Sequence, residues 1–321
     1  MTAIEARPVA GRPPAPWDPV REHRFVTSDG TALHVRSSGP AAAPLTLVLV
    51  HGWTQDHRTW DRVVDEFDRM GDTPARMLRY DLRGHGASAP ARPGTATIEQ
   101  LADDLAELLA ARVPDGPLVL AGHSMGGMTI MALAERHPEL VERRVAGVAF
   151  VATSCGSMDR ITLGLPGVLG TGAAAFERRL AALLLRHRKD RLPLRPATVY
   201  PGTRLLVFGR RPRRADVRDV AAQLLVAHPA SVGGFQQSIS RHDRRVALAR
   251  LRGKPAVVLA GDRDRLCPLP HAEAIAAELP EAGFVRYPGA GHMLAHERAA
   301  GVAARLVTLV RTVAERQGRR A

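Results

Sequence analysis

Cysteine and lysine are scarce in this sequence, and aromatic residues make up only 4% of it. The two cysteines, Cys155 and Cys267, are too few for a disulfide framework, and a reducing cytoplasm fits them best. No apolar run approaches the roughly 20 residues that are needed to span a bilayer. With so few aromatics and no zinc-finger or recognition-helix pattern, the composition also argues against nucleic acid as a partner. We therefore expect a cytoplasmic globular protein without a transmembrane segment.

Residues 1–20 are rich in proline, alanine and arginine and lack the apolar core of a secretory signal, so we expect a flexible leader there. The chain is 45% hydrophobic and long enough for one large domain with a sizeable insertion. Its net charge of +13 is uneven, because residues 155–250 hold 18 basic and 6 acidic groups. Such a segment is either a solvated arginine-rich surface or a cationic insertion that attracts an anionic substrate, carrier or membrane face. The sequence leaves both interpretations open.

Strand-like and helix-like segments alternate along most of the chain. An antiparallel hairpin is expected first, from Arg24–Thr27 and Ala32–Arg36. Later strands are expected at Leu45–Val50, Ala75–Asp81, Leu118–Ala121, Val145–Ala152, Pro255–Gly261 and Gly283–Tyr287. Helices are expected at Arg58–Met70, Ile98–Arg112, Met125–His137, His271–Leu279 and Ala299–Ala314. This alternation predicts an α/β fold with a mostly parallel central sheet flanked by helices.

Residues 155–250 interrupt the alternation. We expect helices there at Ala173–Leu185, Asp216–Ala227 and Ser231–Ser240, and loops at Pro193–Pro201 and Arg210–Arg214. Residues 155–250 are therefore interpreted as a helical cap, inserted into a core domain that comprises residues 21–154 and 251–321. No helical segment shows a strong apolar face flanked by arginines, so the sequence does not favour work at a lipid interface.

Residues 122–126 have the sequence Gly-His-Ser-Met-Gly and lie between an expected strand and an expected helix. On such a strand–turn–helix the backbone of the central residue is strained, and flanking glycines avoid the crowding that side chains would cause. The turn pushes the hydroxyl of Ser124 out at the carboxyl edge of the sheet. This context is typical of a nucleophile elbow.

A serine hydroxyl is a weak nucleophile until a base removes its proton and a third group orients the base. Candidates for both lie after later strands, at the carboxyl ends where open α/β sheets place their ligand sites. Asp264 is the predicted acid; Asp262 is the second choice, since it is placed to accept turn amides. His292, among glycines, is the predicted base, whereas His296 is expected to begin the last helix.

Acyl transfer also needs donors for the oxyanion, and removing one such donor typically costs about 3 kcal/mol. One predicted donor is the backbone N–H of Met125, the residue after Ser124. The other is the backbone N–H of Trp53, which follows a strand and a glycine. Its ring is expected either to line the pocket or to lie in the core. His51 and His123 are expected to be structural hydrogen-bonding residues.

These motifs resemble the α/β-hydrolase superfamily, and more narrowly its capped single-domain members with a Gly-His-Ser-Met-Gly-Gly elbow. The resemblance runs from Arg24 to Ala314 and includes residues 51–53 and the segment 81–88, which in the family is a structural loop beside the elbow. It implies a nucleophile, an acid, a base and two oxyanion donors at Ser124, Asp264, His292, Trp53 and Met125. Haloalkane dehalogenases and epoxide hydrolases of this fold carry an aspartate nucleophile, so both are disfavoured.

We therefore expect a serine hydrolase that cleaves a carboxylic ester, or a related acyl bond, of a small to medium hydrophobic substrate through an acyl-enzyme. No metal and no organic cofactor is implied. The alternatives are a thioesterase or tailoring hydrolase that acts on a carrier-bound acyl group, a carbon–carbon bond hydrolase, and a ligand-binding receptor on the hydrolase fold. Because all of these share one triad, the catalytic residues do not choose among them.

Overall fold

The computed structural model describes residues 21–40, 43–71, 75–158, 167–187 and 189–319, so the leader expected at residues 1–20 lies outside them. Within these residues one sheet has the strand order β1-β2-β4-β3-β5-β6-β7-β8. The strands are β1 (Arg21–Val26), β2 (Ala32–Ser38), β3 (Leu45–Val50), β4 (Ala75–Tyr80), β5 (Leu118–His123), β6 (Val145–Val151), β7 (Ala256–Gly261) and β8 (Gly283–Tyr287). β2 is antiparallel to β1 and β4, and the other pairs are parallel. The predicted α/β fold with a mostly parallel sheet is confirmed.

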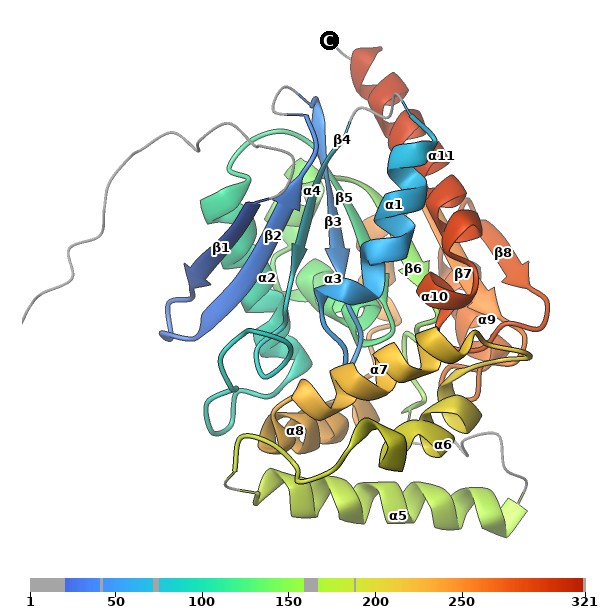
Figure 1. The fold of residues 1–321 in the computed structure, drawn as a ribbon. Helices are drawn as coiled ribbons and strands as arrows, with labels where there is room; N and C mark the ends of the chain where they lie inside the picture. Colours follow the sequence, from blue (N-terminus) through green and yellow to red (C-terminus); the bar gives the residue numbers. More distant parts are fainter. Residues whose placement is uncertain (1–20, 41–42, 72–74, 159–166, 188, 320–321) are drawn as a thin grey trace, which may run out of the picture.

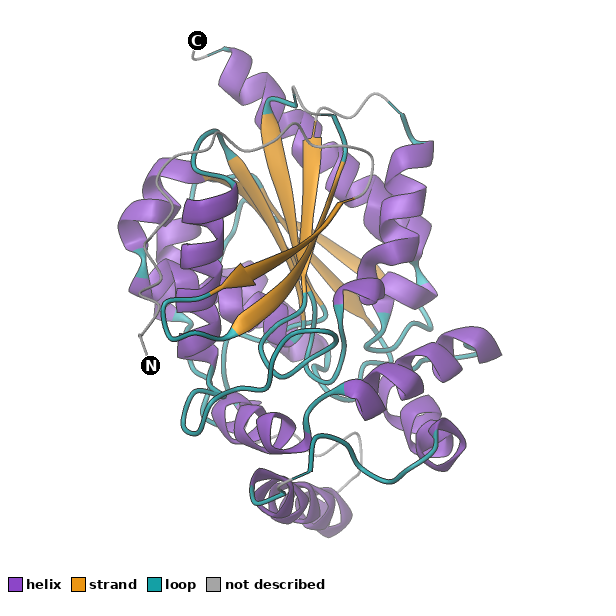
Figure 2. Cartoon of the chain, turned by 60° about the vertical axis from the view of Figure 1, so that its left-hand side comes forward, coloured by secondary structure: helices purple, strands orange, loops and turns teal. Residues whose placement is uncertain are grey.

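Helices cover both faces of the sheet (Figure 2). They are α1 (Asp61–Arg69), α2 (Ile98–Arg112), α3 (Met125–Arg136), α4 (Pro138–Arg144), α9 (Leu269–Glu278), α10 (Leu294–Glu297) and α11 (Ala299–Gly318), with 3-10 turns η1 (His57–Trp60) and η3 (Val246–Leu251). Alternate strand residues serve two cores, as the pleat requires. Val48 packs in the core with α2 and α3, and Leu47 packs in the core with α1 and α11. Burial on both faces explains why these strands are continuous apolar runs.

Among the residues that the structure describes between β6 and β7 are four α-helices: α5 (Gly167–Leu185), α6 (Pro196–Val207), α7 (Arg214–Val226) and α8 (Pro229–Ser240). Figure 1 shows them beyond the carboxyl ends of the parallel strands, with α5 outermost. α5 rests on α8 with little space between the backbones, since a Cβ on Gly233 would lie 2.4 Å from the carbonyl oxygen of Ala181. These helices therefore cover the edge of the sheet at which Ser124 is found.

The loop predicted at Pro193–Pro201 is wrong, because helix α6 begins at Pro196 and contains Pro201. Proline suits the first position of a helix, where its missing N–H would have no partner, while the interior Pro201 forgoes one backbone hydrogen bond. Helix α4 was also missed, and it too begins at a proline, Pro138. At both positions proline starts a helix rather than breaking one.

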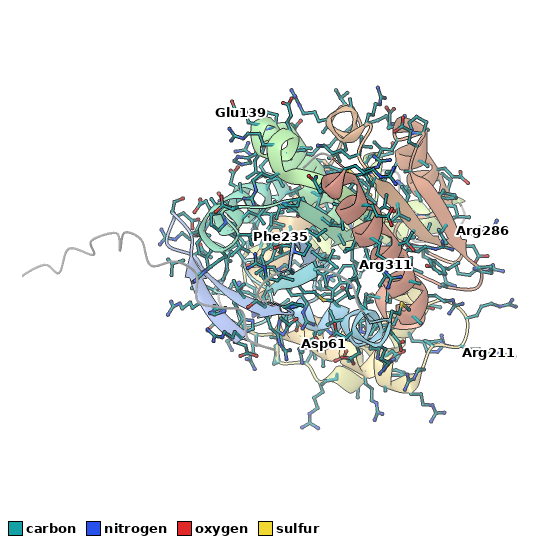
Figure 3. The ribbon with its side chains drawn as sticks, turned by 90° about the horizontal axis from the view of Figure 1, so that it is seen from above. Asp61, Glu139, Arg211, Phe235, Arg286 and Arg311 are labelled. Atoms are coloured by element: carbon teal, nitrogen blue, oxygen red, sulfur yellow. The ribbon has the colours of Figure 1, made fainter. Side chains whose placement is uncertain are left out.

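Polar and charged side chains radiate from the outside of the fold. In Figure 3, Arg211 and Arg286 extend away from the body of the protein, whereas Phe235 lies inside it.

Among the described residues, no helix combines the length and the apolar character that crossing a membrane demands.

Candidate active site

Ser124 occupies the sharp turn between β5 and α3. Its backbone has φ 51° and ψ −119°, a strained conformation for a residue with a side chain. Its N–H donates to the carbonyl of Val151 on the neighbouring strand at 3.0 Å. A Cβ on Gly126 would lie 2.2 Å from the carbonyl oxygen of Val50, so only glycine fits there. The turn thus has the geometry of the predicted nucleophile elbow.

Asp264 and His292 form a buried hydrogen-bonded pair. Oδ2 of Asp264 lies 2.8 Å from Nδ1 of His292, and the two side chains are almost fully buried. Oδ1 of the same carboxylate accepts hydrogen bonds from the backbone N–H groups of Leu266 and Cys267, each at 2.8 Å. Because an ionised carboxylate can only accept, Nδ1 of His292 carries a proton, and in the neutral ring Nε2 then has a free lone pair.

The competing residues identified from the sequence lie elsewhere. Oδ1 of Asp262 accepts from the N–H of Gly289 at 2.7 Å, and Oδ2 accepts from Arg286 at 3.2 Å. Asp262 is thus a turn-stabilising carboxylate. His296 lies in α10 rather than in the last helix, and its Nε2 is 3.3 Å from Oδ2 of Asp219. Of the four candidates for acid and base, the structure pairs only Asp264 with His292.

Ser124 and His292 line the same cavity, which has a volume of about 500 Å³. No hydrogen bond joins their side chains, and Nε2 of His292 has no partner among the described residues. Catalytic hydrogen bonds are often long before substrate binds. Apolar side chains from the inserted helices and their connections form most of the wall: Leu180, Leu184, Leu192, Leu194, Val199, Leu206, Val207, Val220, Leu224, Ala227, Pro229 and Val232.

The loop after β3 lies beside the elbow. A Cβ on Gly52 would come within 3.1 Å of the Cβ of Ser124, so the two turns are in close contact. None of the described residues accepts a hydrogen bond from the backbone N–H of Trp53 or of Met125. The Trp53 ring lines the cavity, and its Nε1–H donates to the carbonyl of Val232 in α8 at 3.1 Å. Two unengaged amides at this edge suit the binding of a developing negative charge.

His51 and His123 bond to the backbone, as expected of structural residues. His51 accepts at Nε2 from the N–H of Leu82 at 2.9 Å. Nε2 of His123 lies 2.9 Å from the carbonyl oxygen of His292. Complete burial lowers the pKa of His123 well below its ordinary value, and the nearby His292 adds a smaller electrostatic effect in the same direction. His123 therefore stays neutral and holds the backbone of His292 as a donor.

Two contacts that the sequence did not predict position the His292 loop. The carbonyl of Val207, at the end of α6, accepts from the N–H groups of His292 and Met293 at 2.9 and 3.2 Å. Glu297 accepts at Oε1 from the N–H of Gly291 at 2.9 Å. Burial raises the pKa of Glu297, and the hydrogen bonds that its carboxylate accepts from the backbone of Gly209 and Gly291 only partly offset this effect. The sequence does not reveal these contacts, since they involve backbone carbonyl and N–H groups, which nearly every residue carries.

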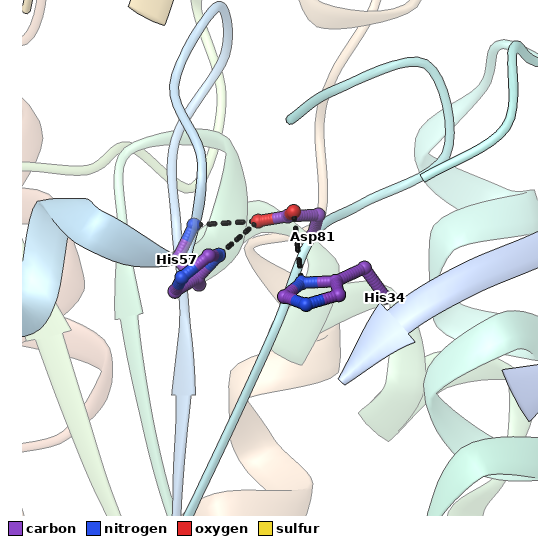
Figure 4. A group of neighbouring side chains, drawn as sticks. All are labelled: His34, His57 and Asp81. Atoms are coloured by element: carbon purple, nitrogen blue, oxygen red, sulfur yellow. Dashed lines mark hydrogen bonds and ion pairs between the residues drawn. The ribbon is translucent and has the colours of Figure 1, made fainter. Parts of the chain in front are cut away.

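Asp81 anchors the structural loop beside the elbow (Figure 4). Its Oδ1 accepts from the N–H and the Nδ1 of His57 at 2.7 and 2.8 Å, and its Oδ2 accepts from the N–H of Ala87 at 2.8 Å. His34 approaches Oδ2 to 3.2 Å. Burial pushes the pKa of Asp81 up, but hydrogen bonds from His34 and His57 outweigh it, so the pKa lies well below its usual range. Both oxygens are already engaged, so we interpret the cluster as structural rather than metal-binding.

The sheet topology and the elbow define a protein of the α/β-hydrolase type, and comparison with known proteins agrees. A family model described as the alpha/beta hydrolase family matches residues 47–305, most of the chain. The chain belongs to the alpha/beta hydrolase family.

Individual relatives include esterases. The chain is 29% identical over 252 residues to the pimeloyl-[acyl-carrier protein] methyl ester esterase of Aromatoleum aromaticum, covering 77% of this chain and 90% of that protein. It is 26% identical over 260 residues to a putative carbamate hydrolase of Yersinia enterocolitica, covering 80% of this chain and 83% of that protein. The structure also resembles a thermophilic esterase from Thermogutta terrifontis, with a TM-score of 0.71, 26% identity, and coverage of 91% and 99%.

Proposed function

We propose that this protein is a serine esterase in which Ser124 is the nucleophile, His292 the base and Asp264 the acid that orients the base. The observation that carries the proposal is the buried Asp264–His292 hydrogen bond, with the free nitrogen of that ring in the same apolar cavity as Ser124. We further propose that the helices α5 to α8 act as a cap on a core formed by residues 21–154 and 251–321.

The reaction follows from these positions. Nε2 of His292 takes the proton of Ser124 Oγ as the oxygen attacks the ester carbonyl. The backbone N–H groups of Trp53 and Met125 stabilise the oxyanion of the tetrahedral intermediate. His292 then gives its proton to the departing alcohol, which leaves an acyl-enzyme. Water, deprotonated by the same ring, attacks the acyl-enzyme, and the acid is released.

The cavity indicates the class of substrate. Its wall of leucine and valine side chains excludes charged acyl groups and binds a small to medium hydrophobic one. Ser124 and His292 contribute polar groups to this wall, so the ester end of the substrate is oriented toward them.

The test uses a fluorophosphonate probe and a panel of p-nitrophenyl esters of increasing acyl length. Ser124→Ala is expected to abolish labelling and to lower turnover by a factor on the order of 10⁴ or more. Ser154 offers a matched control, because its hydroxyl lies 2.7 Å from Nδ1 of another histidine, His271. Ser154→Ala should keep both labelling and turnover. Labelling without turnover on any ester would favour the ligand-receptor alternative and overturn the proposal.

A carrier-bound acyl ester is the second candidate substrate. It is supported by the similarity to the pimeloyl-[acyl-carrier protein] methyl ester esterase of Aromatoleum aromaticum and by the excess of arginine in residues 155–250. Acyl carriers are acidic, so their association with a basic cap would weaken as salt screens the charges. The rate on a carrier-bound ester should then fall steeply with added salt, while the rate on a small ester should not. An equal response of both substrates would exclude this candidate.

A reducing, cytoplasmic location is proposed from the thiols. Cys155 and Cys267 are unpaired and buried. Burial raises the pKa of both thiols, so neither forms a reactive thiolate near neutral pH.

A further inference from the structure

Helix α5 exposes large apolar side chains on its outer face. Val168, Phe176 and Leu183 are 87%, 67% and 68% exposed. Phe176, Leu180 and Leu183 follow the i, i+4, i+7 spacing that places residues on one side of a helix. The opposite side packs on α8 through the buried Ala181. The apolar stripe is therefore not used in packing α5 against α8. The sequence predicts no helix with a strong apolar face flanked by arginines, and α5 differs from that expectation.

Arginines accompany this stripe on the same helix. Arg179 and Arg186 are exposed and follow Phe176 and Leu183 by three residues, which places them on the flank of the stripe, and neither forms an ion pair with another described residue. An exposed apolar stripe beside unpaired cations is the pattern of a helix that lies in the interface of an anionic bilayer.

The stripe is continuous with the active-site cavity. Leu180 and Leu194 both line the cavity and are 44% and 43% exposed at the surface of the protein. An acyl chain can therefore pass from a bilayer at α5 to the neighbourhood of Ser124 along apolar side chains, without crossing bulk water.

We propose that the outer face of α5 docks on an anionic lipid bilayer, with Phe176 and Leu183 inserted among the acyl chains and Arg179 and Arg186 against lipid phosphates. The surface would deliver membrane-resident esters to the cavity. Lipid binding itself does not depend on the proposed esterase activity.

Two other occupants fit the surface less well. An acidic carrier protein would satisfy the arginines but would leave the large apolar side chains without an apolar partner. A second copy of this chain would place the arginines of one α5 against those of the other in a two-fold contact, which is electrostatically unfavourable.

The test is co-sedimentation with sucrose-loaded vesicles of phosphatidylcholine, either pure or with about 30% phosphatidylglycerol, a charge comparable to anionic leaflets. All proteins carry Ser124→Ala, so that hydrolysis cannot alter the lipid. The parent should bind the anionic vesicles and not the neutral ones. Phe176→Ser with Leu183→Ser should weaken partitioning about tenfold or more. Arg179→Gln with Arg186→Gln should weaken it by about fivefold for each charge removed.

Val246→Ser is the matched control, because Val246 is 88% exposed but lies in η3, beside the opposite end of the sheet. It should leave binding unchanged. Variants with an intact Ser124 should hydrolyse a short, water-soluble ester at the parental rate, which shows that the fold is preserved.

Three results would overturn the proposal. The first is an absence of binding to anionic vesicles, and the second is equal binding by the parent and the Phe176/Leu183 variant. The third is sedimentation velocity showing a dimer that the same variant dissociates, because the stripe would then be a contact between two copies. Loss of rate by this variant on a carrier-bound ester, without any vesicle binding, would assign the stripe to an acidic protein instead.

Discussion

Replacing Asp264 with asparagine removes one charge from the site while preserving its shape. In the wild type one oxygen accepts two backbone N–H groups and the other accepts Nδ1–H of His292. Asparagine has only one oxygen, and the two amides outnumber the single histidine donor. The oxygen should therefore stay on the amides of Leu266 and Cys267, which turns the new NH₂ group toward Nδ1. His292 must then protonate Nε2, and in that tautomer it cannot accept the proton of Ser124.

The expected loss in kcat is about 10⁴-fold at neutral pH, equivalent to about 5.5 kcal/mol of transition-state stabilisation. That factor is the one known for the same change in serine proteases. Initial rates on p-nitrophenyl butyrate measure it, with circular dichroism to show that the fold persists.

Asp262→Asn is the matched control, since Asp262 leaves the same strand two residues earlier but bonds to Gly289. Its kcat should stay within about tenfold of the wild type, because the carboxylate does not touch His292. Equal losses in the two variants, or full activity in Asp264→Asn, would refute the assignment of Asp264 as the acid.

Three further predictions concern stability. Gly126→Ala should unfold at a markedly lower temperature or fail to fold, because its Cβ would meet a carbonyl oxygen at 2.2 Å, whereas Gly172→Ala, with nothing within 4 Å, should not be destabilised. Arg83→Met leaves its buried aspartate partner unpaired and should cost about 3–5 kcal/mol in urea unfolding. A hydrogen bond with Asp81 raises the pKa of His34, so its stabilisation is complete below about pH 6.5 and is lost as the pH rises through the higher folded value. The wild type should therefore lose melting temperature relative to His34→Gln above pH 6.5; a constant difference would contradict this.

Most of the core could be predicted because its signals are local. The strand Leu45–Val50 and the helix Ile98–Arg112 have the predicted bounds, since an apolar run and a periodic leucine face each determine one element. The elbow was equally local, because glycines and a serine at fixed spacing follow a strand. The Asp262 and Asp264 alternatives could only be ranked, since the partners that distinguish the two carboxylates, Gly289 and His292, lie 27 and 28 residues further along the chain.

The cap was predicted less well because its information is not local. Proline marks a helix start in α6 as readily as a loop, and the surrounding residues do not decide between the two. The apolar stripe of α5 could not be classified from its spacing, since the same leucines would suit a packed helix. Only the position of α8 shows which side of α5 is covered.

The contact between the Val207 carbonyl and two successive amides has a consequence for how substrate is admitted. The carboxyl end of α6 cannot shift without displacing His292, so a gate on that side would misalign the base at every opening. Substrate enters instead past Leu180 and Leu194, which line the cavity and are exposed at the surface, so its entry needs no movement of α6.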